Sequence, residues 1–72
     1  QPVHMYTHSL TYEDEAGASW ASAEDSPDAA VGLIVWAEEW SDHPKGSDFI
    51  LARFREWADQ RGMKYKIAVG RH

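Results

Sequence analysis

Cysteine is absent from this 72-residue chain. Its absence excludes disulfide bonds, thiolate zinc sites and thiol nucleophiles, and it fits a reducing compartment, so we expect a cytoplasmic protein. Long apolar runs are absent too. The longest, residues 29–37, is interrupted by Gly32 and falls short of the roughly 18 residues that a membrane span needs, so we expect no membrane partner. A chain of this length predicts one compact domain over residues 1–72, with a small core.

Basic residues are absent from the first 44 positions, which carry nine carboxylates. From Lys45 onward there are seven bases and three acids, so the two parts carry net charges of −9 and +4. Such an asymmetry indicates interaction through charge, although two halves that fold against each other would partly neutralise it.

Residue alternation predicts a β-hairpin at the N-terminus. We expect a first strand over residues 3–12, a turn over residues 13–17 and a return strand over residues 18–23. On the face of the first strand that we expect to be buried lie Tyr6, His8, Leu10 and Tyr12.

Two helices are predicted after the hairpin. Ser26 as a cap and Pro27 at the first helical position indicate a helix over residues 27–40. Its apolar arc consists of Ala29, Ala30, Leu33, Ile34, Trp36, Ala37 and Trp40. Ser47 is the expected cap of a second helix, which Gly62 ends. The apolar arc of this helix consists of Ile50, Leu51, Phe54, Trp57 and Ala58.

The clearest strand pattern lies near the C-terminus. Residues 63–69 place Lys64 and Lys66 on one face and apolar side chains on the other. The predicted fold class is therefore α+β, a two-layer domain in which a small antiparallel sheet (the β-hairpin plus the C-terminal strand) packs on two helices in the order ββααβ.

Catalytic and metal-binding motifs are lacking. His4 and His8 share strand parity but would lie about 13 Å apart at about 3.3 Å per residue, too far to ligate one ion. The acidic run at residues 13–15 lacks the spacing of a calcium loop, and there is neither a nucleophile elbow nor a glycine-rich phosphate loop. We expect no enzyme activity, no cofactor and no bound metal.

A basic surface is one candidate for binding. The predicted second helix and last strand would present Arg53, Arg55, Lys64, Lys66 and Arg71, which suits a direct nucleic-acid-binding domain. The net charge of −5 opposes phosphate attraction, and Tyr65 is expected on the inner face rather than among the lysines.

An acidic surface is the favoured candidate. It would consist of Glu13, Asp14, Glu15, Glu24, Asp25, Asp28, Val31, Val35, Glu38, Glu39 and Asp42. The two valines would be apolar anchors within a charged rim, as in protein interfaces. The alternatives for the valines are burial against the rest of the chain and a homodimer contact.

The sequence therefore predicts a non-catalytic protein-binding module whose partner is a basic protein surface, such as a nuclease or another nucleic-acid-binding complex. Its size and acidity resemble those of phosphate-mimicking inhibitors of nucleases, which are common among phage and mobile-element proteins. The hairpin-then-helix start is similar to that of small, homodimeric antitoxin domains. No motif in the chain is specific to either class.

Overall fold

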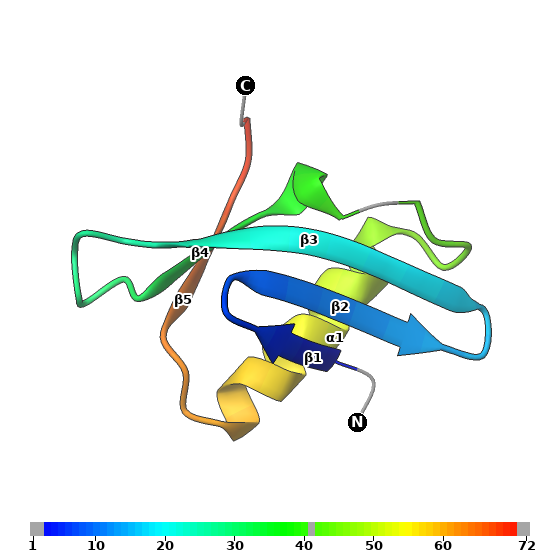
Figure 1. Cartoon of the computed structure of the whole chain (residues 1–72), viewed down its shortest axis with the longest axis horizontal. Helices are drawn as coiled ribbons and strands as arrows, with labels where there is room; N and C mark the ends of the chain where they lie inside the picture. The colour runs from blue at the N-terminus through cyan, green and yellow to red at the C-terminus, as the bar shows by residue number, and fades with distance from the viewer. Residues whose placement is uncertain (1–2, 41, 71–72) are drawn as a thin grey trace.

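The computed structural model describes residues 3–40 and 42–70, in which a five-stranded mixed sheet carries one α-helix on one face (Figure 1). The elements are β1 (Val3–Tyr6), β2 (Ser9–Asp14), β3 (Gly17–Asp25), β4 (Leu33–Trp36), the 3-10 turn η1 (Ala37–Glu39), α1 (Ser47–Gln60) and β5 (Tyr65–Ala68). The strands lie in the order β1-β2-β3-β4-β5. The α+β class is confirmed. The ββααβ order and the two-helix layer are wrong, and β5 pairs parallel to β4, so the sheet is mixed rather than antiparallel.

The predicted first strand is two strands. Tyr6 pairs with Ser9 across a two-residue turn at Thr7, whose φ is 56°. Because the chain reverses here, the predicted inward face does not continue across the turn: Tyr6 and His8 are exposed, whereas Leu10 and Tyr12 are buried. The turn lacks Gly, Asn and Pro, which are the residues that normally indicate a two-residue hairpin.

The predicted return strand is confirmed as β3, which is longer than expected. Asp14 pairs with Gly17 across a tight turn, and β3 continues to Asp25. Its residues alternate from Ser19 to Glu24, with Ala21 and Ala23 buried and Ser22 and Glu24 exposed.

The predicted helix over residues 27–40 is wrong, because this segment is a loop, a strand and a 3-10 turn. Ser26 closes the loop: its N–H donates to the Gly32 carbonyl at 2.8 Å, and its Oγ accepts from the Asp28 N–H at 3.0 Å. Gly32 has a φ of 79°, which stops a right-handed helix before the four apolar residues of β4. β4 is paired along both edges, by β3 and β5, with Leu33 and Val35 buried on one face and Ile34 and Trp36 half-buried on the other, and a continuous apolar run is typical of such a strand.

The predicted second helix is confirmed as α1, but Gly46 rather than Ser47 is its N-cap. Its inner side buries Ile50, Phe54, Trp57 and Ala58. The last strand is shorter than predicted, and Val69 beyond it is 74% exposed.

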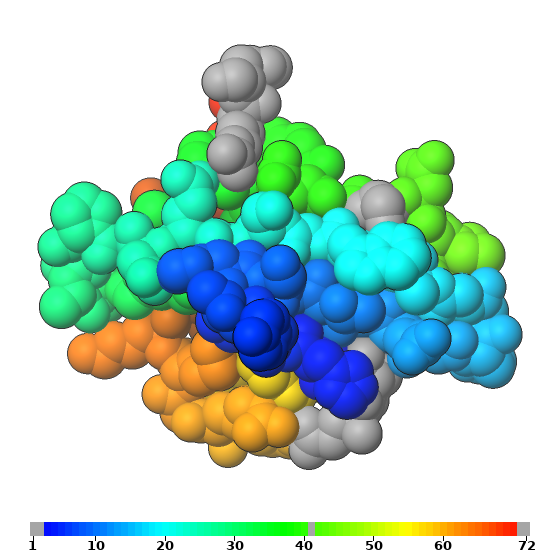
Figure 2. Space-filling view, in the orientation of Figure 1, coloured from blue at the N-terminus to red at the C-terminus, as the bar shows by residue number. Residues whose placement is uncertain are grey.

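The two faces of the sheet differ in cover. α1 lies behind the sheet in Figure 1, and the core forms on that side. The core residues are Val3, Leu10, Tyr12, Ala21, Ala23, Leu33, Val35, Trp40, Ile50, Phe54, Trp57 and Ala58. The opposite face, shown in Figure 2, carries no helix among the described residues, and β1, β2 and β3 (blue to cyan) occupy its centre. Within the described ranges, no helix has the length and apolar character needed to cross a membrane.

Candidate functional site

The helix-free face of the sheet carries exposed aromatic side chains. Strand register places Trp20 opposite Thr11 and Thr11 opposite His4, all on the side away from buried Leu10. Trp20 is 59% exposed, and Tyr6, on the same side of β1, is 84% exposed. Large apolar surface exposed in this way is a common mark of an interaction site.

Carboxylates flank these aromatics on the same face. Glu24 pairs with Ile34, opposite in parity to the buried Ala23–Val35 pair, and its Oε2 accepts a 2.7 Å hydrogen bond from the half-buried Trp36 indole. Glu13 pairs with Ala18, which is two residues from Trp20 along β3 and has the same parity. We name this surface the aromatic face; it consists of Tyr6, Trp20, Trp36, Glu13 and Glu24.

The eleven residues predicted to form one acidic surface are divided between several places. Glu13, Asp14 and Glu15 lie at the β2–β3 turn, whereas Glu24, Asp25 and Asp28 lie at the other end of β3. Asp25 is eight residues along β3 from Gly17, about 26 Å at about 3.3 Å per residue. Glu38 and Glu39 lie in η1, and Asp42 is exposed in the following loop. The structure therefore places these carboxylates in three groups, at the two ends of β3 and around η1.

The valine anchors are also corrected. Val35 is fully buried in β4, so the alternative, burial within the chain, holds for it. Val31 is half-buried in the β3–β4 loop, where it lines a groove beside β5. Neither belongs to the aromatic face.

Asp14 is occupied by contacts within the fold. Its side chain is only 9% exposed and ion-pairs with Lys45 at 3.1 Å. The Tyr12 hydroxyl donates to Oδ2 at 2.6 Å, and the N–H groups of Ala16 and Gly17 donate to Oδ1 at 2.9 and 3.2 Å. This carboxylate therefore orders the β2–β3 turn and offers little charge to a partner.

His43 completes the same network from the loop before α1. Its fully covered ring accepts the Lys45 N–H at Nδ1, at 3.1 Å, so the proton of the neutral ring is on Nε2. Nε2 lies 3.1 Å from Asp14 Oδ1 and 3.3 Å from the Gly17 carbonyl oxygen, both acceptors. The His43 ring thus links the turn to the loop as a structural donor.

The network shifts the ionisation of its members. Burial raises the pKa of the Asp14 carboxyl, but hydrogen bonds from Tyr12, Lys45 and Ala16 outweigh burial and hold this pKa well below its ordinary value. Burial, followed by the hydrogen bond to Asp14, raises the pKa of Tyr12. Hydrogen bonds to Glu15 and Asp14 raise the pKa of Lys45. The folded chain thereby stabilises the charged forms of Asp14 and Lys45 and the neutral form of Tyr12.

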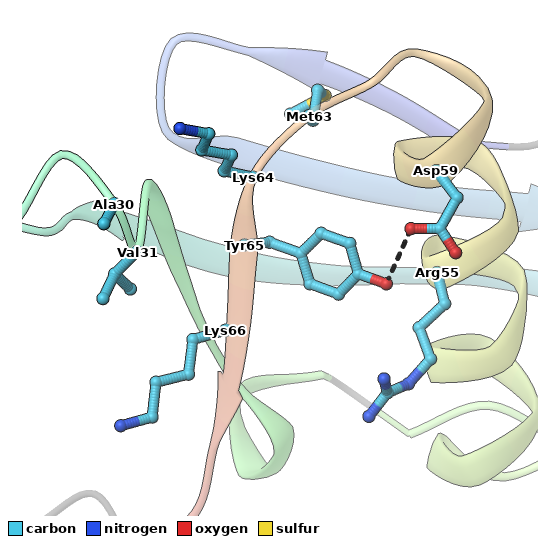
Figure 3. Close-up of a pocket in the computed structure, with 8 residues that line it drawn as sticks. All are labelled: Ala30, Val31, Arg55, Asp59, Met63, Lys64, Tyr65 and Lys66. Carbon is cyan, nitrogen blue, oxygen red and sulfur yellow. Dashed lines mark hydrogen bonds between the residues drawn. The ribbon is translucent and has the colours of Figure 1, made fainter.

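Three of the predicted basic residues converge on one open groove of about 560 Å³ beside β5. Arg55 reaches it from α1, and Lys64 and Lys66 come from the β5 segment (Figure 3). Arg53 lies elsewhere, paired with Glu56 at 2.8 Å. Arg71, the fifth predicted residue, lies outside the described residues.

Within the part of the chain that the structure describes, the cations of this groove differ from other cations of the molecule in having no ion-pair partner. Lys45 and Arg53 pair with carboxylates, and Arg61 stacks over the Trp57 ring at 4.8 Å. Among the described residues, the cations that form no ion pair within 4 Å include Arg55, Lys64 and Lys66, the three that line the groove. The groove, lined by these three cations and by the Asp59 carboxylate, therefore carries a net positive charge on an acidic protein.

Within the described ranges, no three His, Asp or Glu side chains are grouped as a metal site would require. Comparison of the chain with family models, with curated proteins and with solved structures gave no match. The geometry of the aromatic face and of the groove is therefore the basis for a functional proposal.

Sequence reasoning missed the aromatic face, although a signal for it exists. Trp20 shares strand parity with Ser22 and Glu24, and a polar set of this parity indicates the solvent side of a half-buried strand. The exposure of Tyr6 could not be found in the same way, because the turn at Thr7 carries no recognisable turn residue.

Proposed function

We propose that this chain is a non-catalytic protein-binding module that engages its partner through the aromatic face. The observation that carries the proposal is the joint exposure of Trp20 and Tyr6 on the helix-free side of the sheet. Neither side chain contributes its ring to the core on the α1 side. Exposing such rings to water forgoes the stabilisation that burial gives, so a partner that covers them gains it on binding.

Tryptophan and tyrosine suit this role because they supply large contact areas at little cost in side-chain entropy, and they are enriched among interface residues that dominate affinity. The flanking Glu13 and Glu24 would form a charged rim. Carboxylates around apolar anchors favour a partner with basic groups around an apolar pocket.

We infer that this partner is a basic protein surface, of the kind found on nucleases and other nucleic-acid-handling proteins. Occupying such a surface would block it, so an inhibitor or regulator is the role that we propose. The expected cytoplasmic setting and the resemblance to phage or mobile-element inhibitors belong to the same proposal.

Direct nucleic-acid binding is less well supported by the arrangement. Stacking platforms for single strands combine exposed rings with cations along one groove. Here the exposed rings have Glu13 and Glu24 beside them, and Arg53 is already paired with Glu56. Phosphates approaching Trp20 would meet carboxylates.

The proposal is tested by site-specific photocrosslinking in cells that produce the full chain. A photoreactive amino acid at Ser22, which is exposed between Trp20 and Glu24 on the same side of β3, is compared with one at Ala52, exposed on α1. We expect Ser22 to capture a basic protein that Ala52 does not. Equal capture at both positions would contradict a face-specific contact.

The captured protein is then purified and titrated with variants. Trp20→Ala should weaken binding by about 30-fold or more, as expected for an anchor worth about 2 kcal/mol. Charge reversal at Glu13 and Glu24 should weaken it further and reduce its salt dependence. Asp48→Lys on α1 is the matched charge control. Unchanged affinity of Trp20→Ala would overturn the proposal.

A further inference from the structure

The outer edge of β5 has backbone groups without a partner. The Leu33 N–H donates to the Lys64 carbonyl at 3.0 Å, and Leu33 pairs with Tyr65 in the parallel ladder. In such a ladder, the residues on either side of the paired one turn their backbone groups toward the neighbouring strand. The backbone N–H and C=O groups of Lys64 and Lys66 therefore point toward β4, and those of Tyr65 and Ile67 point away from it. Among the described residues no hydrogen bond to these four groups is present.

Side chains on both sides of β5 form the walls of the groove along this edge. Figure 3 shows Tyr65 pointing toward α1 and Lys66 pointing to the other side, near Val31. Arg55 lies on the α1 side, so cations stand on both walls. The Asp59 carboxylate, also in the groove, accepts a hydrogen bond from the Tyr65 hydroxyl, with 3.1 Å between the two oxygens, and this bond satisfies part of its hydrogen-bonding capacity.

We propose that the free edge of β5 binds an extended acidic segment of a partner protein, which adds to the sheet as a further strand. The segment would be held by main-chain hydrogen bonds to Tyr65 and Ile67 and by carboxylates directed at Arg55, Lys64 and Lys66. Lys66 is level with Glu24 of the aromatic face two strands away, but this proposal does not depend on the function proposed for that face.

Charge and alternation together select an acidic strand as the occupant. Side chains of an added strand point alternately to the two faces of the sheet, so carboxylates on either face would meet a cation. Lysines on an edge strand repel basic strands and discourage apolar ones, which is how edge strands avoid indiscriminate pairing. Val31 and Met63 give the groove an apolar part that can receive a side chain between the carboxylates. Main-chain pairing of this kind is an established mode of peptide recognition.

The test uses the full chain and a fluorescent eight-residue peptide in which glutamate alternates with valine and threonine. We expect saturable binding, measured by fluorescence anisotropy at low salt. Replacing the glutamates with lysines should abolish it. N-methylation of alternate peptide bonds keeps the charge but removes main-chain donors, and it should weaken binding at least about tenfold if a ladder forms. Equal binding of the N-methylated peptide would overturn the proposal.

Variants of the chain provide the second arm. Lys64→Gln together with Lys66→Gln should weaken peptide binding at least about fivefold, because two exposed charge pairs are lost. Arg55→Gln should weaken it as well. Arg53→Gln, on the same helix but outside the groove, is the matched control and should bind as the wild-type chain does. If a single-stranded oligothymidine of ten nucleotides competes with the peptide at equal concentration, the groove recognises anions in general and the proposal fails.

Discussion

A side chain at position 32 would collide with the β5 segment. A Cβ placed on Gly32 would lie 2.7 Å from the Lys64 Cβ and 2.8 Å from its carbonyl carbon, closer than real Cβ atoms approach other atoms. The backbone there also has a φ of 79°, in the region that glycine adopts without penalty. Gly32 therefore permits the β3–β4 loop, and Val31 with it, to lie against β5 and form one wall of the groove.

We expect Gly32→Ala to lower the free energy of unfolding by about 2–4 kcal/mol, because it adds a backbone collision to the cost of a left-handed residue. Gly62→Ala is the matched control. Gly62 has a φ of 67° but open space around it, so only the conformational cost of about 1–2 kcal/mol applies. Urea denaturation measures both. Equal losses would show that the loop does not need its close approach to Lys64.

The lowered pKa of the Asp14 carboxyl predicts how the stability of the fold responds to acid. Its pKa in the folded chain lies below its ordinary value of 3.8, so the stability it contributes is present above that value and is lost as the pH falls below it. The urea midpoint should therefore decrease as the pH is lowered from about 5 to about 2. Asp14→Asn should lower the midpoint at neutral pH and flatten its decrease in acid, and Tyr12→Phe, which removes one donor, should do so in part. A decrease in Asp14→Asn as steep as in the wild-type chain would contradict this assignment.

Helices and strands whose apolar residues follow the spacing of their buried face could be predicted from the sequence. α1 was found because its apolar positions recur at helical spacing and one side packs on the sheet. β3 and β5 were found because one face of each is exposed and their residues alternate. The local rules and the tertiary environment agree in these three elements.

β4 could not be predicted in the same way. All four residues of β4, Leu33 to Trp36, are apolar, so the sequence of this central strand shows no apolar–polar alternation and also fits a helical arc. Ser26 and Pro27 looked like a helix start because the same hydrogen bonds that cap helices also close loops. What favours the strand is its pairing with β3 and β5, which lies outside any local window.

The strand assignment of β4 is tested by two valines. Val35 is fully buried, so Val35→Ala should lower the free energy of unfolding by about 2–3 kcal/mol. Val31→Ala, in the half-buried loop, should cost less than about 1 kcal/mol. In the helix that the sequence suggested, both valines would share an outer face and both changes would be mild. Thermal unfolding followed by circular dichroism distinguishes the two outcomes.

Candidate site residues were predicted by type more successfully than by position. Arg55, Lys64 and Lys66 do come together, because the predicted helix and strand that carry them exist. The acidic set is divided, because part of it was placed on a predicted helix that is absent and the length of β3 separates Glu13, Asp14 and Glu15 from Glu24, Asp25 and Asp28. A run of charged residues in a sequence predicts a charged surface only when the helices and strands that carry those residues are predicted correctly.

At the scale of the whole molecule, the sheet presents two surfaces of opposite character. The aromatic face is flanked by carboxylates, and the groove beside β5 carries cations without carboxylate partners. A domain of this size is stabilised by only a few kcal/mol, and its core uses the α1 side of the sheet. The other face and the free edge are thus left for contacts with other molecules.

The two surfaces should act independently. Trp20 is four residues along β3 from Glu24, which is level with Lys66 two strands away, so Trp20 and Lys66 are about 16 Å apart at the usual strand spacings. Effects at sites more than about 10 Å apart with no shared partner add within about 0.5 kcal/mol. Trp20→Ala should therefore leave binding of the acidic peptide unchanged within about twofold, and Lys64→Gln with Lys66→Gln should leave crosslinking from Ser22 unchanged. Titrating all three variants and their combination measures this additivity. A loss of peptide affinity in Trp20→Ala would show instead that one partner covers both surfaces or that the sheet transmits the change. A general loss of stability would also lower the affinity, and the unfolding midpoint of the same variant detects it.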